Sequence, residues 1–276
     1  MSEKLHGYAR EITETPVTAG SVGIYWLGQA GFILRGERTT IAIDVYLSPR
    51  DTRRFDPPVT PAELKFVDAF LATHEHIDHL DLPQWPALAA AAPGARFIVP
   101  LPLVERATEA VGGGRVSGAV PDVPIGIGGA TVTPIPARHG VHMADAYTFG
   151  LVPGEYRHLG YVVDLGGVRV YHAGDTIRYD GMAERIGALR ADVALLPING
   201  RTPEREAQDL VGNLSAVEAA DLAADAGVAA VIPMHYELFA HNSGRVADLV
   251  DRVTDAHPRL AVHVLPRYGG MIYRPR

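Results

Sequence analysis

Cysteine is absent from this 276-residue chain. Disulfide bonds and thiolate ligands are therefore excluded, so any metal site must use His, Asp, Glu and water. No apolar run approaches the ~20 residues that span a bilayer, and residues 1–8 lack the apolar segment of a secretory signal peptide. We expect a cytoplasmic protein with no membrane partner.

Positive charge is also in short supply, because 25 Lys and Arg residues face 32 Asp and Glu residues and leave a formal charge of -7. A mildly acidic chain argues against nucleic acid as the main partner and leaves a small-molecule substrate as the expectation. The hydrophobic content of 47% is ordinary for a globular protein with a sizeable core. No long linker divides the chain, so residues 1–276 are predicted to form a single domain.

Short apolar segments separated by turns that contain Gly and Pro predict many strands and fewer helices. Gly166-Gly167 predicts the turn of a hairpin, and Ser215 with Glu218 predicts the capping box of a helix. Residues 121–129 are interpreted as a loop. The predicted fold class is α/β, a sandwich of two sheets with helices outside. We expect strands at residues 23–27, 31–34, 40–44, 67–73, 96–99, 131–135, 160–165, 168–172, 193–197, 230–233 and 260–264, and helices at 82–92, 103–111, 215–226 and 246–256.

The most informative segment is residues 73–81, which hold three histidines and three carboxylates directly after the apolar run at 66–72. Neutral imidazole and carboxylate are good ligands for zinc, manganese or iron. A solvated surface loop is the alternative interpretation. Ligand-type residues further along the chain argue against it, because His139, Asp175 and His235 each follow an apolar strand at its carboxyl end. Rigid strand ends suit the fixed geometry of a metal site.

The motif His74-Glu75-His76-Ile77-Asp78-His79 resembles the H-x-H-x-D-H motif of the metallo-β-lactamase superfamily of hydrolases. The resemblance extends from about Ile24 to Ile272 and implies an αββα sandwich of two mixed sheets, with the site at one edge between them. It also implies two divalent metal ions, zinc or manganese with iron possible. The first ion would be held by His74, His76 and His139, the second by Asp78, His79 and His235, and both by a bridging Asp175.

This ligand set predicts hydrolysis by a metal-bridging hydroxide. One zinc ion already brings the pKa of a bound water to about 7, so a water shared by two cations would ionise near neutral pH. Asp78 and Asp175 are the predicted catalytic residues. Asp175 would span the two cations, and Asp78 would orient the hydroxide and later carry its proton.

Other segments resemble the bacterial L-ascorbate-6-phosphate lactonase group, namely residues 26–32, 41–44, 197–201, 212–215 and 231–236. This resemblance implies a lactone or similar ester of a phosphorylated sugar acid as substrate, and a homo-oligomer is plausible. Arg201, Asn199 and Asn213 are the candidate substrate contacts, because a guanidinium binds phosphate well. A solvated arginine and asparagines that satisfy loop backbone are the alternatives for them.

Two other functions stay open on the sequence. The main alternative is a metal-dependent phosphodiesterase that acts on a small cyclic or lipid phosphodiester. The other alternative is a metal-binding module without catalysis. The ligand set argues against it, because a structural zinc site is usually closed by four ligands, whereas this set leaves room for water. Redox chemistry is disfavoured, because the flavodiiron relatives carry an acidic residue where His76 stands.

Some residues near the motif have two interpretations. Asp44 ends a strand, where it would either orient metal ligands or cap a turn. The remaining histidines are interpreted as surface or hydrogen-bonded side chains, with His172 as the exception to watch because it lies close to Asp175. They are His142, His158, His172, His241, His257 and His263.

Overall fold

The computed structural model describes residues 7–145, 148–150, 152 and 154–275. Residues 1–6, on which the expectation of no signal peptide rests in part, lie outside this range. Among the described residues, no helix combines the length and the apolar character that a membrane span requires.

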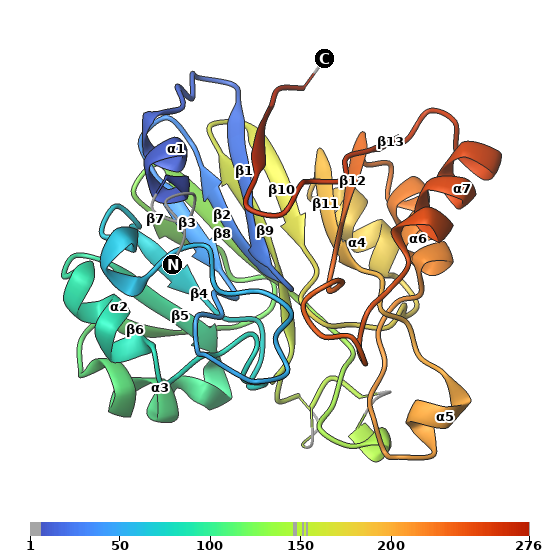
Figure 1. Cartoon of the computed structure of the whole chain (residues 1–276), viewed down its shortest axis with the longest axis horizontal. Helices are drawn as coiled ribbons and strands as arrows, with labels where there is room; N and C mark the ends of the chain where they lie inside the picture. Colours follow the sequence, from blue (N-terminus) through green and yellow to red (C-terminus); the bar gives the residue numbers. More distant parts are fainter. Residues whose placement is uncertain (1–6, 146–147, 151, 153, 276) are drawn as a thin grey trace.

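Two seven-stranded sheets form the centre of the fold (Figure 1). The first sheet has the order β14-β1-β2-β3-β4-β5-β6, with β1 (Val22–Gly28), β2 (Gly31–Arg35), β3 (Thr40–Ile43), β4 (Ala69–Leu71), β5 (Arg96–Pro100), β6 (Val116–Ala119) and β14 (Gly270–Tyr273). The second has the order β13-β12-β11-β10-β9-β8-β7, with β7 (Ile125–Ile127), β8 (Ala130–Pro136), β9 (Leu159–Leu165), β10 (Val168–His172), β11 (Val193–Pro197), β12 (Ala230–Met234) and β13 (Ala261–Val262).

Both sheets are mixed. In the first sheet, the pairs from β14 to β3 are antiparallel and those from β3 to β6 are parallel. In the second sheet, the pairs from β13 to β10 are parallel and those from β10 to β7 are antiparallel. The parallel strands of each sheet therefore end at a common edge, and loops after those strands are brought together.

Helices cover the outer faces of the two sheets (Figure 1). On the first sheet lie α1 (Tyr8–Glu14), α2 (Trp85–Ala91) and α3 (Val104–Val111), and on the second lie α4 (Met182–Ala188), α6 (Ala216–Asp225) and α7 (Val246–Ala256). The short helix α5 (Pro203–Glu206) stands apart from both layers in Figure 1. The predicted αββα sandwich is confirmed.

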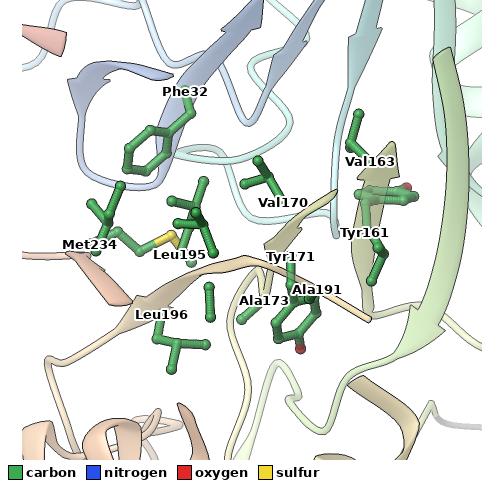
Figure 2. Close-up of a cluster of buried hydrophobic side chains, with 14 of the residues drawn as sticks. Phe32, Tyr161, Val163, Val170, Tyr171, Ala173, Ala191, Leu195, Leu196 and Met234 are labelled. Carbon is green, nitrogen blue, oxygen red and sulfur yellow. The ribbon is translucent and has the colours of Figure 1, made fainter. Parts of the chain in front are cut away.

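The core between the sheets is formed by alternating side chains. Figure 2 shows Phe32 of β2 facing Val170 of β10 and Leu195 of β11, while Tyr171 and Leu196 point to the opposite face of the second sheet. All five side chains are buried. Strands buried on both faces read as continuous apolar runs, which is why the sequence predicted β11 well.

Several local predictions are confirmed. Strands β9 and β10 form the hairpin around Gly166-Gly167, α6 begins with the capping box of Ser215 and Glu218, and α7 has the predicted bounds. Strand β4 is shorter than the predicted strand at 67–73, because it covers only Ala69–Leu71. The interpretation of residues 121–129 as a loop is wrong at Ile125–Ile127, because β7 pairs there with β8 at the edge of the sheet. The prediction also omitted β6, β14, α1, α4 and α5.

Candidate metal centre

The seven predicted ligands come from the ends of four strands. The motif at residues 74–79 follows β4 of the first sheet, and His139, Asp175 and His235 follow β8, β10 and β12 of the second sheet. The loop after β4 is tied to the second sheet, because Leu159 N donates to Thr73 O at 3.0 Å. The ligands therefore meet between the two sheets at one edge.

The first ligand group contains His74, His76, His139 and Asp175, whose ligand atoms all lie within 4.8 Å of one another. The ring centroids of the three histidines are 4.6, 5.0 and 5.1 Å apart. Three imidazoles that bind one ion through bonds of ~2.1 Å place their centroids about 5 Å apart. This spacing fits a single metal ion.

The second group contains Asp78, His79 and His235, whose ligand atoms also lie within 4.8 Å of one another. Asp78 Oδ2 is 3.8 Å from His79 Nε2 and 3.7 Å from His235 Nε2. Asp175 reaches this group as well, at 3.4 Å from His79 Nε2 and 3.3 Å from His235 Nε2, and it lies 3.5 Å from His139 Nε2 in the first group. Asp175 thus contacts both groups.

The protonation states of the first group suit a metal ion. Burial lowers the pKa of His74 well below its usual value, lowers that of His76 and brings that of His139 to about 3. Neutral imidazoles with free lone pairs are the form that binds metal.

The second group has the electrostatics of a cation site. Burial alone would lower the pKa of His79, but Asp175, Asp44 and Asp78 raise it well above its usual value. Burial would raise the pKa of Asp175, yet His235 and His79 hold it well below its usual value. His79 Nε2 and Asp175 Oδ1 are buried and have no hydrogen-bond partner among the described residues. Donor atoms in such a field fit a divalent ion, which would replace the proton on His79.

Asp44 orients His79 of the second group through the ring nitrogen that faces away from the ligand cluster. Its fully buried carboxylate accepts hydrogen bonds from Thr73 N at 2.8 Å and Thr73 Oγ1 at 2.7 Å, and its Oδ2 lies 2.7 Å from His79 Nδ1. A proton on His79 Nδ1 leaves the lone pair of Nε2 for the ligand cluster. Of the two interpretations of Asp44, the structure supports the one in which it orients a ligand.

Backbone strain gathers at this edge. Asp44 has φ 51°, Gln29 has φ 52° and His235 has φ 61°, a region that residues other than glycine seldom adopt and that often marks functional sites. Gly174 precedes Asp175 with φ 60°, and a Cβ there would lie 2.8 Å from Leu159 O. The same Cβ would lie 2.8 Å from Cβ of Thr73, which follows β4 of the first sheet. Only glycine fits, so this turn lies close against the end of the first sheet.

The other two carboxylates of residues 73–81 have structural partners. Asp81 accepts hydrogen bonds from Leu47 N at 2.8 Å and Ser48 N at 2.7 Å, so it fixes the loop after β3. Glu75 pairs with Arg157 at 2.6 Å. Asp78 is therefore the one carboxylate of residues 73–81 that lies in a ligand group of the described structure.

Most of the remaining histidines behave as interpreted. His142 and His257 pair with Asp209 and Asp221 at 2.7 Å. His172, the exception to watch, is held by structure: its Nε2 lies 2.7 Å from Ala30 O, and its Nδ1 accepts from Gly174 N at 3.1 Å.

For His158 the interpretation is wrong. It is 3% exposed, its ring centroid lies 5.6 Å from those of His74 and His139, and neither ring nitrogen has a partner among the described residues. Burial lowers its pKa to about 3. The one sequence signal was its position two residues before the predicted strand at 160–165.

The three candidate substrate contacts lie together in one network. Asn213 Nδ2 donates to Asn199 Oδ1 at 3.0 Å, and Asn199 Nδ2 donates to Asn242 at 2.8 Å. Arg201 pairs with Glu218 at 2.5 Å and donates to Asn213 O at 3.0 Å. These bonds order the loop, and the role of Arg201, Asn199 and Asn213 toward substrate stays a prediction.

Known proteins are similar to this chain in sequence and in fold. Residues 39–236 match the family model described as a β-lactamase superfamily domain. The chain belongs to the metallo-β-lactamase superfamily. A UPF0173 metal-dependent hydrolase of Archaeoglobus fulgidus is 33% identical over 78% of this chain and 84% of that protein. A second UPF0173 metal-dependent hydrolase, from Rubrobacter xylanophilus, is 32% identical over 89% of this chain and 94% of that protein.

On the basis of these relatives, this chain is a metal-dependent hydrolase of the UPF0173 family. Its fold is also similar to that of Igni18, a metallo hydrolase of Ignicoccus hospitalis, with a TM-score of 0.71 at 23% identity over 93% of this chain and 100% of the other. The names of these relatives mention neither a lactone nor a phosphorylated sugar, so the lactonase activity stays a prediction.

Proposed function

We propose that this hydrolase opens a lactone, or a similar ester, of a phosphorylated sugar acid with the help of two divalent ions, zinc or manganese. The observation that carries the proposal is the position of Asp175, whose carboxylate lies within 3.5 Å of ligand nitrogens in both groups. A carboxylate with two oxygens is the side chain best suited to join two cation sites.

When bound, divalent ions there would supply a water that ionises near neutral pH and would stabilise negative charge on the carbonyl oxygen. Asp175, ionised at neutral pH, holds the two ligand groups together. Asp78 is the group that exchanges the proton: its side chain is 18% exposed, against 6% for Asp175. His79 and His235 outweigh the effect of burial and lower the pKa of Asp78, so it is a carboxylate at neutral pH and can accept a proton.

In this function Arg201 binds the substrate phosphate, and Asn199 and Asn213 support it. The guanidinium is paired with Glu218, so a phosphate would have to share it or displace the carboxylate. Arg201→Gln should then raise the KM for a phosphorylated lactone and leave that for the plain lactone unchanged.

The test is a hydrolysis panel with manganese-loaded and zinc-loaded protein at neutral pH. Phosphorylated sugar lactones, the matching plain lactones and an activated phosphodiester are compared. Fast ring opening that slows when the phosphate is removed supports the proposal. Inert lactones together with rapid phosphodiester cleavage would replace it with the phosphodiesterase alternative.

A further inference from the structure

Gln29 reaches the ligand cluster from a distant part of the chain. It lies in the turn between β1 and β2, is fully buried and has φ 52°. Its side-chain Nε2 donates to Asp78 Oδ2 at 2.9 Å. Its backbone carbonyl accepts from His235 N at 3.0 Å and from Trp26 Nε1 at 3.0 Å. One residue thus binds two of the three ligands that form the second group.

We propose that Gln29 is a positioning residue for the second ligand group. Its amide binds Oδ2 of Asp78, the oxygen that lies 3.8 Å from His79 Nε2 and 3.7 Å from His235 Nε2, and so fixes the rotation of this carboxylate within the second ligand group. Its carbonyl fixes the strained backbone of His235 at the end of β12. The indole of Trp26 in β1 donates to the same carbonyl. These two bonds connect the first sheet to the loop after β12.

The contact of Gln29 with the His235 ring is packing rather than a directed bond. Nε2 lies 3.3 Å from Nδ1 and 3.2 Å from the Nε2 of His235, so it faces the ring between its two nitrogens. The single well-directed bond of the amide is the one to Asp78. Hydrogen bonds to ligand carboxylates commonly change metal affinity by 10–100-fold.

The amide has a second orientation that the test must separate. Oε1 of Gln29 is buried without a hydrogen-bond partner among the described residues. If the amide turned over, Oε1 would take the place of Nε2 and would act as a direct ligand to the ion. If Oε1 were a ligand, replacing the amide with a carboxylate would strengthen metal binding. If Nε2 is instead a donor to Asp78, the same replacement would remove the N–H group and place two carboxylates against each other.

Gln29→Ala and Gln29→Glu distinguish these roles, with Gln208→Glu, an exposed glutamine, as the matched control. The probes are Mn²⁺ and Zn²⁺ alone: ion content is measured after dialysis, affinity by competition with a chromophoric chelator, and ligand geometry by the visible spectrum of the Co²⁺-loaded protein. Both Gln29 variants should keep one ion, bind the second 10–100-fold more weakly and change the spectrum of that site. Gln208→Glu should match the wild type.

The inference rests on the two-ion centre of the proposed function, and the readout does not involve turnover. Unchanged affinity in both Gln29 variants, with two ions in the wild type, would overturn the inference alone. Tighter binding by Gln29→Glu would overturn it in favour of an oxygen ligand. A wild-type chain that takes up one ion would overturn the dinuclear centre and this inference together.

Discussion

Asp44→Asn is the change that tests the metal centre most cleanly. Asparagine has the same shape as aspartate and tolerates the left-handed backbone at this position, where φ is 51°. The new Oδ1 can accept the bond from Thr73 N, and the new NH₂ can donate to Thr73 Oγ1, which rotates to accept. The same NH₂ then faces His79 Nδ1, which must lose its proton to accept a hydrogen bond. The proton moves to Nε2, the atom that should bind metal.

The magnitude follows from the cost of reversing this tautomer. Metal binding through Nε2 would force two donors against each other, Nδ1–H of His79 and the NH₂ of the introduced amide. A buried donor without an acceptor costs about 1–3 kcal/mol, which corresponds to a loss of about 5–150-fold in affinity. The metal-free chain should also lose stability, because the substitution removes one of the carboxylates that stabilise the protonated form of buried His79, and unfolding without metal measures this loss separately.

The assay compares metal content, affinity by chelator competition and urea unfolding of the metal-free protein. We expect a variant that still folds without metal and binds the second ion about 5–150-fold more weakly than the wild type. Wild-type affinity for both ions in Asp44→Asn would show that Asp44 does not set the tautomer of His79. Equal loss of stability and affinity would show a role in folding alone.

Three other predictions concern the same site. Asp175→Asn should lower turnover by about 10²–10³-fold, the usual cost of removing one electrostatic group from an active site; wild-type turnover would contradict the bridging role. Removing metal with EDTA should lower the Tm, because an ion present at about 1,000 times its Kd stabilises by about 4 kcal/mol, and an unchanged Tm would argue against bound metal. In the metal-free chain, His158 takes a proton only at a pKa of about 3, whereas the unfolded chain takes one near a pKa of about 6.5. Stability should therefore fall as the pH drops below about 6.5, and His158→Gln should remove about 1.4 kcal/mol per pH unit of that slope, a difference that urea unfolding between about pH 7 and pH 4.5 would reveal or refute.

The gathering of the candidate metal ligands could be predicted because each one follows a strand that is itself visible in the sequence. Strands such as β11 and β12 are buried on both faces, so their apolar runs stand out. Parallel strands end at a common edge, and the ligand residues after them must gather there. Topology then brings together His74, His139, Asp175 and His235, although they are spread over more than half of the chain.

The edges of the sheets were harder to predict. β6 and β7 are short and contain glycine, which weakens the alternating pattern. β14 pairs with β1 from the other end of the chain, and no local signal specifies a partner so far away. Their hydrogen bonds, rather than strong strand propensity, make these segments strands.

Gln29 and His158 show why the surroundings of the ligands could not be read from the sequence. Their positions depend on contacts between segments far apart: Gln29 with Asp78 and His235, and His158 with His74 and His139. Ligands are recognisable because metal chemistry restricts them to a few residue types. The residues that hold ligands need only a donor or an acceptor, which many side chains and every peptide group provide. A neutral amide and a neutral imidazole are therefore as informative here as the carboxylates, once the fold places them against the cluster.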